Sequence, residues 1–229
     1  MIRALYAASS GLVAQTVKQD VIAHNIANAQ TPGFKGQKTI ATSFEDELDS
    51  QLSGIRLVCR PSYPDSPVSA RKVLMDSAVD NTQGSIRETG LATDLAITGA
   101  GAFEFSLNGQ TYTSRAGDLT VNGKGELCTL DGAGVMGENG PIKLPEGGWH
   151  VGADGTITDT DGSNIAKIKI VGGQPNTAIR QGCLEEANVN IVSEMVDMIA
   201  NMRSFEANQK VVQSVDGTLD KLISEVGKV

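Results

Sequence analysis

The stretch that decides the fold runs from residue 190 to residue 226 and reads NIVSEMVDMIANMRSFEANQKVVQSVDGTLDKLISEV. Apolar residues recur seven positions apart along it, and further apolar residues fill the intervening positions: Ile191, Met198, Phe205, Val212, Leu219 and Val226, with Met195, Met202, Val215 and Leu222 between them. A heptad period sustained over this length indicates a coiled-coil-like helix. Asn190 is a suitable N-cap, so we expect a helix of about 38 residues to begin there.

The N-terminal end of the chain predicts a second long helix. From residue 1 to about residue 28 there is no proline, and a stripe with steps of three and four contains the apolar residues Leu5, Ala8, Leu12, Ile22 and Ile26, with Gln15 and Gln19 inside it. This spacing is typical of an amphipathic helix. The sequence Thr31-Pro32-Gly33 should end it, because proline cannot continue the helical hydrogen bonds and glycine accommodates a turn.

The middle of the chain has a different character. Most of the glycines lie between residues 84 and 173, where short runs of β-forming residues alternate with Asn-Gly and Asp-Gly pairs such as Asn108-Gly109 and Asp154-Gly155. These pairs accept the positive φ angles of tight hairpins. We therefore expect an all-β domain of short antiparallel strands.

These patterns divide the chain into four segments: an N-terminal helix in residues 1–34, an extended connector in 35–78, a central β domain in 79–180 and a C-terminal helix in 181–229. In the connector, Phe44, Leu48 and Leu52 could form one short helical face, and residues 60–67 are rich in proline. The predicted fold class is α+β, with the long N- and C-terminal helices forming a coiled-coil-like pair beside a central all-β antiparallel domain.

The two end helices indicate self-association. Each needs an apolar partner, and the simplest partner is the other helix. A single helix pair still cannot bury both apolar stripes, and exposed stripes usually mark contacts between molecules. A head-to-tail contact that does not close produces a filament. The predicted assembly interface comprises Leu5, Leu12, Val13, Ile22, Asn25, Ile26, Asn28, Met195, Met198, Met202, Phe205, Val212 and Leu219.

Charge and composition exclude several other classes of protein. The net charge is −8, and the Lys and Arg residues are scattered rather than clustered, so we expect no nucleic-acid partner. No apolar run approaches the ~18 residues of a membrane span, and the N-terminus lacks the pattern of a cleavable signal peptide. The odd number of distant cysteines (Cys59, Cys128 and Cys183) argues against a disulfide framework.

The candidate chemical sites are weak. Residues 132–137 match GxGxxG, but a further turn and Pro141 follow instead of a helix, which favours a hairpin over a dinucleotide site. Asp154, Asp159 and Asp161 lack the spacing of a calcium loop. His24 and His150 have no partnered nucleophile. We therefore expect no enzyme activity, cofactor, metal ion or small-molecule substrate.

Motifs at both ends of the chain resemble a known family. Five stretches carry the resemblance: residues 5–12 (LYAASSGL), 20–28 (DVIAHNIAN), 31–35 (TPGFK), 181–190 (QGCLEEANVN) and 203–208 (RSFEAN). They closely resemble the terminal signatures of bacterial flagellar rod and hook proteins. Within that family, residues 137–147 and 198–206 are most similar to the proximal-rod protein of the F type, with a distal-rod or hook-type subunit as the alternative. The chain is shorter than is usual for either, with a segment missing after Val171.

The resemblance implies a structural role. It implies export by the flagellar type III apparatus, assembly in the periplasmic basal body with copies of itself and other rod proteins, and a rod that transmits motor torque. A rival hypothesis is a peptidoglycan- or carbohydrate-binding module built on the β domain. That module would need an exposed aromatic platform, for which the β domain offers Phe103, Phe105, Tyr112 and Trp149.

Overall fold

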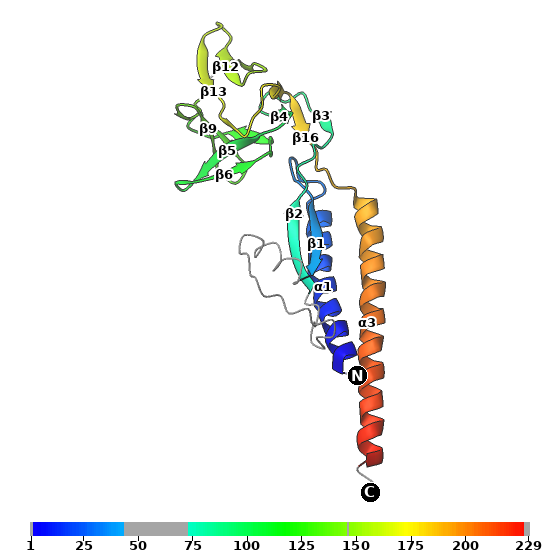
Figure 1. Ribbon diagram of the computed structural model, residues 1–229. Helices are drawn as coiled ribbons and strands as arrows, with labels where there is room; N and C mark the ends of the chain where they lie inside the picture. The colour runs from blue at the N-terminus through cyan, green and yellow to red at the C-terminus, as the bar shows by residue number, and fades with distance from the viewer. Residues whose placement is uncertain (1, 44–72, 146, 227–229) are drawn as a thin grey trace, which may run out of the picture. The chain divides into compact units, whose positions relative to one another are not determined.

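The computed structural model describes residues 2–43, 73–145 and 147–226 (Figure 1). The predicted helical face of Phe44, Leu48 and Leu52 and the proline-rich residues 60–67 lie outside this range. The chain forms two compact units. Of the described residues, the helical unit comprises 2–26, 37–43, 73–79 and 190–226, and the β unit comprises 27–36, 80–145 and 147–189. Each unit therefore combines stretches that are far apart in the sequence.

The helical unit contains both predicted helices. Helix α1 spans Ile2–Ala27 and helix α3 spans Ile191–Val226, and the two lie side by side (Figure 1). The Asn190 side-chain oxygen accepts hydrogen bonds from the backbone N–H groups of Val192 (3.0 Å) and Ser193 (3.3 Å), so it caps α3 as expected. The predicted α+β class, with paired end helices around a central antiparallel β region, is confirmed.

A β-hairpin completes the helical unit. Strands β1 (Gln37–Ser43) and β2 (Val73–Val79) pair antiparallel over their whole length, from Gln37 opposite Val79 to Ser43 opposite Val73. The hairpin lies within the segment that we expected to be an extended connector. The sequence does not predict this hairpin, because residues 44–72 separate the strands and neither strand shows clear apolar alternation.

The β unit consists of short antiparallel strands. Their bounds are β3 Ile86–Glu88, β4 Leu95–Thr98, β5 Ala102–Leu107, β6 Gln110–Ser114, β7 Leu119–Val121, β8 Leu127–Thr129, β9 Gly134–Gly137, β10 Gly140–Pro141, β11 Trp149–Val151, β12 Thr156–Asp159, β13 Asn164–Lys167, β14 Ile170–Val171, β15 Ala178–Gln181 and β16 Cys183–Glu185. The largest sheet has the order β14-β5-β9-β8-β7, with β6 on β5 and β10 on β9. A sheet of β11-β12-β13 and the pairs β15-β4 and β16-β3 complete the unit.

Apolar side chains from several of these strands form the core of the β unit. Phe103 and Phe105 are fully buried and meet edge to face, with ring centroids 6.3 Å apart. The predicted hairpin at Asn108-Gly109 joins β5 to β6, and both residues have positive φ (52° and 84°). The GxGxxG stretch forms a turn and strand β9, which pairs with β10, so its interpretation as a hairpin is confirmed.

The β unit also contains a partly buried carboxyl group, Asp118, bridged to Asp94 in the backbone. Burial raises the pKa of Asp118 above its ordinary value of 3.8, and the carboxylates of Asp94 and Asp131 act in the same direction, although the backbone hydrogen bond opposes them. The folded state therefore binds this proton more tightly than the unfolded state does. The contribution of Asp118 to the free energy of unfolding is fully present below pH 3.8. It is lost as the pH rises through the raised pKa.

We expect Asp118→Asn to raise the denaturation midpoint of the full chain at pH 7, because asparagine lacks the buried charge. Guanidinium titrations at pH 7 and pH 3 check this, and the difference from wild type should shrink at pH 3. A lower midpoint for the variant at pH 7 would contradict the assignment.

Candidate assembly interface

Helices α1 and α3 pack antiparallel, and three contacts define their register. Asn25 Nδ2 donates to Glu194 Oε1 (3.3 Å), and Asn201 Nδ2 donates to Gln15 O (2.8 Å) and to Gln19 Oε1 (2.9 Å). Further along, a Cβ atom on Gly11 would lie 2.9 Å from the Asn208 amide nitrogen. The 14 positions from Gly11 to Asn25 thus match the 14 from Glu194 to Asn208. The helices are in register over four turns.

This seam has a polar layer that was not among the features predicted from the sequence. On α3, apolar residues recur every seven positions, and all of those from Ile191 to Leu219 except the exposed Phe205 are half-buried. A second set with the same spacing faces α1, and its first three members are polar: Glu194, Asn201 and Asn208. Asn201 is only 5% exposed. A buried amide in a helix pair fixes the register, at some cost in stability, because a shifted register would leave it without partners. The seven-residue spacing of these polar side chains was visible in the sequence.

Asn201→Ala is expected to destabilise the helix pair by about 1–2 kcal/mol, because it removes both hydrogen bonds and leaves a small cavity. Hydrogen exchange of the full chain measures the effect, and backbone amides on both helices should exchange faster. Gln213→Ala, at an exposed position of α3, is the control and should leave exchange unchanged. Equal effects of the two changes would show that the Asn201 hydrogen bonds contribute nothing to pairing.

The structure divides the predicted interface residues into three groups. Ile22 and Asn25 are buried, and Asn25 exchanges hydrogen bonds with both backbone groups of Gln37 (2.8 and 2.9 Å). Six are half-buried: Leu12, Ile26, Asn28, Met198, Val212 and Leu219. Five are exposed: Leu5, Val13, Met195, Met202 and Phe205. The buried residues stabilise the chain's own fold, which leaves the exposed residues available for contacts with other molecules.

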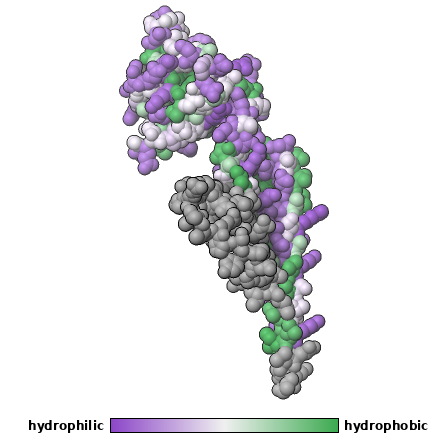
Figure 2. Space-filling view, in the orientation of Figure 1, coloured by the Kyte–Doolittle hydropathy of each residue, from purple (hydrophilic) through white to green (hydrophobic). Residues whose placement is uncertain are grey.

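A continuous apolar surface lies on the first three turns of α3, and we call it the head patch. It consists of Val192, Met195, Val196, Ile199 and Met202, each at least 50% exposed. Figure 2 shows green, apolar residues along the helical unit. Beyond Met202 the same face of α3 is polar: Glu206, Lys210, Gln213 and Asp220. An exposed apolar patch with a polar border is typical of a protein–protein contact.

In the β unit, a buried ionic cluster centres on Glu185, which is 1% exposed. Its carboxylate accepts hydrogen bonds from Lys35 Nζ (2.5 Å), from Arg115 Nη1 (3.2 Å to each oxygen) and from the backbone N–H of Gly84 (3.0 Å). Arg115 also donates to the carbonyl oxygen of Gly101 (2.7 Å). The cluster thus ties the TPGFK motif, where the chain leaves α1, to strand β16, which precedes α3.

Asn188 ties the same segments together a few residues further on. Its side-chain oxygen accepts from the Gly36 N–H (2.7 Å), and its Nδ2 donates to the carbonyl oxygens of Asp80 (2.8 Å) and Thr82 (3.1 Å). The chain passes between the two units after Ile26, Gly36, Val79 and Val189. Glu185 and Asn188 lie within the motif stretch of residues 181–190, but the sequence does not reveal which distant residues they contact.

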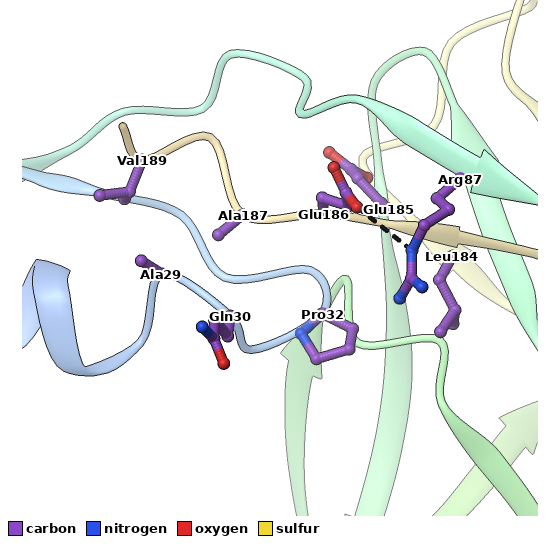
Figure 3. A pocket seen from close by; sticks show the side chains of 9 residues that line it. All are labelled: Ala29, Gln30, Pro32, Arg87, Leu184, Glu185, Glu186, Ala187 and Val189. Carbon is purple, nitrogen blue, oxygen red and sulfur yellow. Dashed lines mark ion pairs between the residues drawn. The ribbon is translucent and has the colours of Figure 1, made fainter. Parts of the chain in front are cut away.

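A pocket of about 400 Å³ lies beside this cluster (Figure 3). Pro32 and Gln30 line one side, and Leu184 and the exposed ion pair of Arg87 Nε with Glu186 Oε1 (3.2 Å) line the other. Its lining contains neither a candidate nucleophile nor a histidine. This arrangement offers no constellation for catalysis.

The other candidate chemical residues have structural surroundings. Asp154 accepts hydrogen bonds from the Thr156 hydroxyl (2.6 Å) and backbone N–H, and these bonds lower its pKa, as is typical of a turn carboxylate. Within the described ranges, no three His, Cys, Asp or Glu side chains are grouped to hold a metal ion. No helix in the described part of the chain is long and apolar enough to cross a membrane.

Comparisons with known proteins match both ends of the chain and its full length. A family model described as "Flagella basal body rod protein" matches residues 5–35, and another, "Flagellar basal body rod FlgEFG protein C-terminal", matches residues 180–225. The chain is 30% identical to flagellar basal-body rod protein FlgF of Caulobacter vibrioides over 257 positions, covering all of both proteins. It is 30% identical to FlgF of Salmonella typhimurium over 267 positions, covering 98% of this chain and 99% of that protein.

Relatives with another rod-protein name, FlgG, match the chain as well. Flagellar basal-body rod protein FlgG of Bacillus subtilis is 27% identical over 267 positions, with 98% of this chain and 99% of the relative covered. These alignments are longer than the 229 residues of the chain, so the relatives carry segments that it lacks. Both terminal matches fall on the predicted motifs, and they identify a structural rather than an enzymatic family. The chain belongs to the flagellar basal-body rod protein family.

Proposed function

We propose that the chain is a structural subunit of the proximal part of the flagellar rod, which it helps to build by polymerising through its terminal helices. The resemblance of residues 137–147 and 198–206 to the proximal-rod protein of the F type supports the proximal position. The similar matches to FlgF and FlgG proteins make a distal-rod or hook-type subunit the alternative.

The head patch is the observation that carries the assembly part of this proposal. Fully burying a Val, Ile or Met side chain contributes about 1.5–3 kcal/mol, so burying these half-exposed side chains contributes on the order of 1 kcal/mol each. The total, on the order of 5 kcal/mol, is close to the lower estimates of the entropic cost of association. One such contact is therefore weak, and it suits a polymer in which each subunit makes several contacts.

The proposed position in the rod determines the partners and the cellular location that we propose. The subunit would lie in the basal body within the periplasmic space, beside copies of itself and other rod proteins. The flagellar type III apparatus would export it without a cleavable signal. Because close-packed helices deform little, a shaft of interlocked helix pairs would transmit motor torque.

Deleting the gene in the source bacterium tests this proposal. We expect cells without motility and without a complete rod, and re-expression of the chain should restore both. Mass spectrometry of the remaining basal bodies distinguishes the rod positions, because loss of a proximal subunit should also remove the distal-rod proteins, whereas loss of a distal subunit should leave proximal ones in place. Normal rods in the deletion strain would contradict the proposal.

The rival carbohydrate-binding module finds little support in the β unit. Phe103 and Phe105 are fully buried, and Trp149 packs against the core. Tyr112 is 41% exposed, but its ring stacks on Phe105 at 5.5 Å. These rings do not form the flat, exposed platform on which a sugar would stack.

A further inference from the structure

Helix α3 is longer than the helix that pairs with it. In the observed register, Ile2 at the start of α1 lies opposite residue 217 of α3. Residues 218–226 therefore continue beyond α1 for roughly 14 Å (Figure 1). Two large apolar side chains are exposed on this extension, Leu222 (44%) and Ile223 (70%). We call these two residues the tail patch.

The tail patch continues the seam that α1 covers elsewhere. Leu222 occupies the same heptad position as Glu194, Asn201 and Val215. The face of α3 that packs on α1 within the chain is thus left open at its C-terminal end. A helix that presents the same apolar face beyond its partner is suited to continue the packing on another helix.

Head patch and tail patch lie at opposite ends of α3. The exposed residues between them are mostly polar, with Phe205 (38%) and Val211 (45%) as the large apolar exceptions. The head patch extends over residues 192–202, roughly 15 Å, which matches the roughly 14 Å of the extension. The two patches differ in sequence and position. Two unlike complementary patches on one molecule produce a head-to-tail contact, which leaves a free patch at each end of every complex.

We propose that the tail patch of one copy packs on the head patch of a second copy, so that the α3 helices overlap end to end along a polymer. This inference rests on the proposed function and specifies which surfaces meet. It explains why the apolar surface on the outer face of α3 ends at Met202: only the first turns of each helix are covered by the extension of the neighbour.

Two variants of the full-length chain test this contact, Ile199→Asp in the head patch and Ile223→Asp in the tail patch. Sedimentation velocity over a range of concentrations measures association. Wild type should form complexes that grow beyond a dimer, and each variant should associate at least 10-fold more weakly. An equimolar mixture of the two variants should form a one-to-one dimer and stop there, because one intact head patch and one intact tail patch remain.

Control variants separate the contact from misfolding. Gln213→Asp, on the polar part of the exposed face, should associate like wild type. Ile199→Gln and Ile223→Gln add no charge and should weaken association by a smaller factor. Circular dichroism should show unchanged helix content in every variant.

Three results would overturn the proposed contact. These are wild-type-like association of either aspartate variant, a mixture that forms no dimer, and wild type that stays monomeric or stops at a closed dimer. None of them bears on rod membership, which the deletion experiment decides separately. Rods that require the chain, together with any of these results, would refute the head-to-tail contact while leaving the proposed function intact.

Discussion

Replacing Glu185 with glutamine is expected to lower the free energy of unfolding by about 3–5 kcal/mol. Among the residues that the structure describes, Glu185 is the carboxylate that pairs with both Lys35 and Arg115, whose side chains are each 11% exposed, so the change leaves these two buried cations without that counter-charge. Guanidinium unfolding of the full chain measures the loss. Trp149, the single tryptophan, lies in the β unit and reports its unfolding by fluorescence.

The neighbouring residue provides a matched control. Glu186 makes its ion pair with Arg87, and the two side chains are 48% and 62% exposed. Glu186→Gln removes the same charge one position along the chain. It should lower the free energy of unfolding by less than about 1 kcal/mol, because surface ion pairs contribute little to stability. Similar losses for the two variants would show that the Glu185 cluster contributes no more than a surface ion pair.

Gly33→Ala should also destabilise the chain strongly, by roughly 2–5 kcal/mol. Gly33 has φ of +69°, where an alanine costs about 1–2 kcal/mol. In addition, the new Cβ atom would lie 2.2 Å from the carbonyl carbon of Arg115, and the backbone must move to relieve this overlap, at about 1–3 kcal/mol. The same fluorescence-detected titration measures the change.

Gly90→Ala isolates the effect of the backbone angle. Gly90 has almost the same φ (+72°), but a Cβ atom there would have no neighbour within 4 Å. Gly90→Ala should lower the free energy of unfolding by about 1–2 kcal/mol. If Gly33→Ala were no more destabilising than Gly90→Ala, the close packing of the TPGFK turn against Arg115 would be wrong.

The features that the sequence predicted correctly are those with a local physical cause. The heptad spacing between Ile191 and Leu219 indicated the length of α3, and Asn190 indicated its start. The Asn108-Gly109 pair indicated a hairpin because few other residues accept its backbone angles. Each of these signals depends on residues close together in the chain.

Features that depend on distant residues could not be predicted in the same way. Strands β1 and β2 pair across residues 44–72, and the Glu185 cluster joins side chains from residues 35, 115 and 185. The polar seam of α1 and α3 was missed for a different reason. A coiled coil is recognised by its apolar heptad positions, whereas Asn201 and Glu194 are polar residues at positions that are usually apolar.

The central claim is that exposed apolar residues of α3 join this subunit to its neighbours in the rod. Incorporation of Met202→Asp into basal bodies tests it most directly, with Gln213→Asp as the control on the polar part of the same helix face. Quantitative mass spectrometry of basal bodies purified from cells that express each variant at equal levels gives the incorporated amount. We expect at least a 10-fold loss for Met202→Asp, because a charge without a partner would be buried in the contact, and wild-type incorporation for Gln213→Asp. Equal incorporation of the two variants would contradict the account.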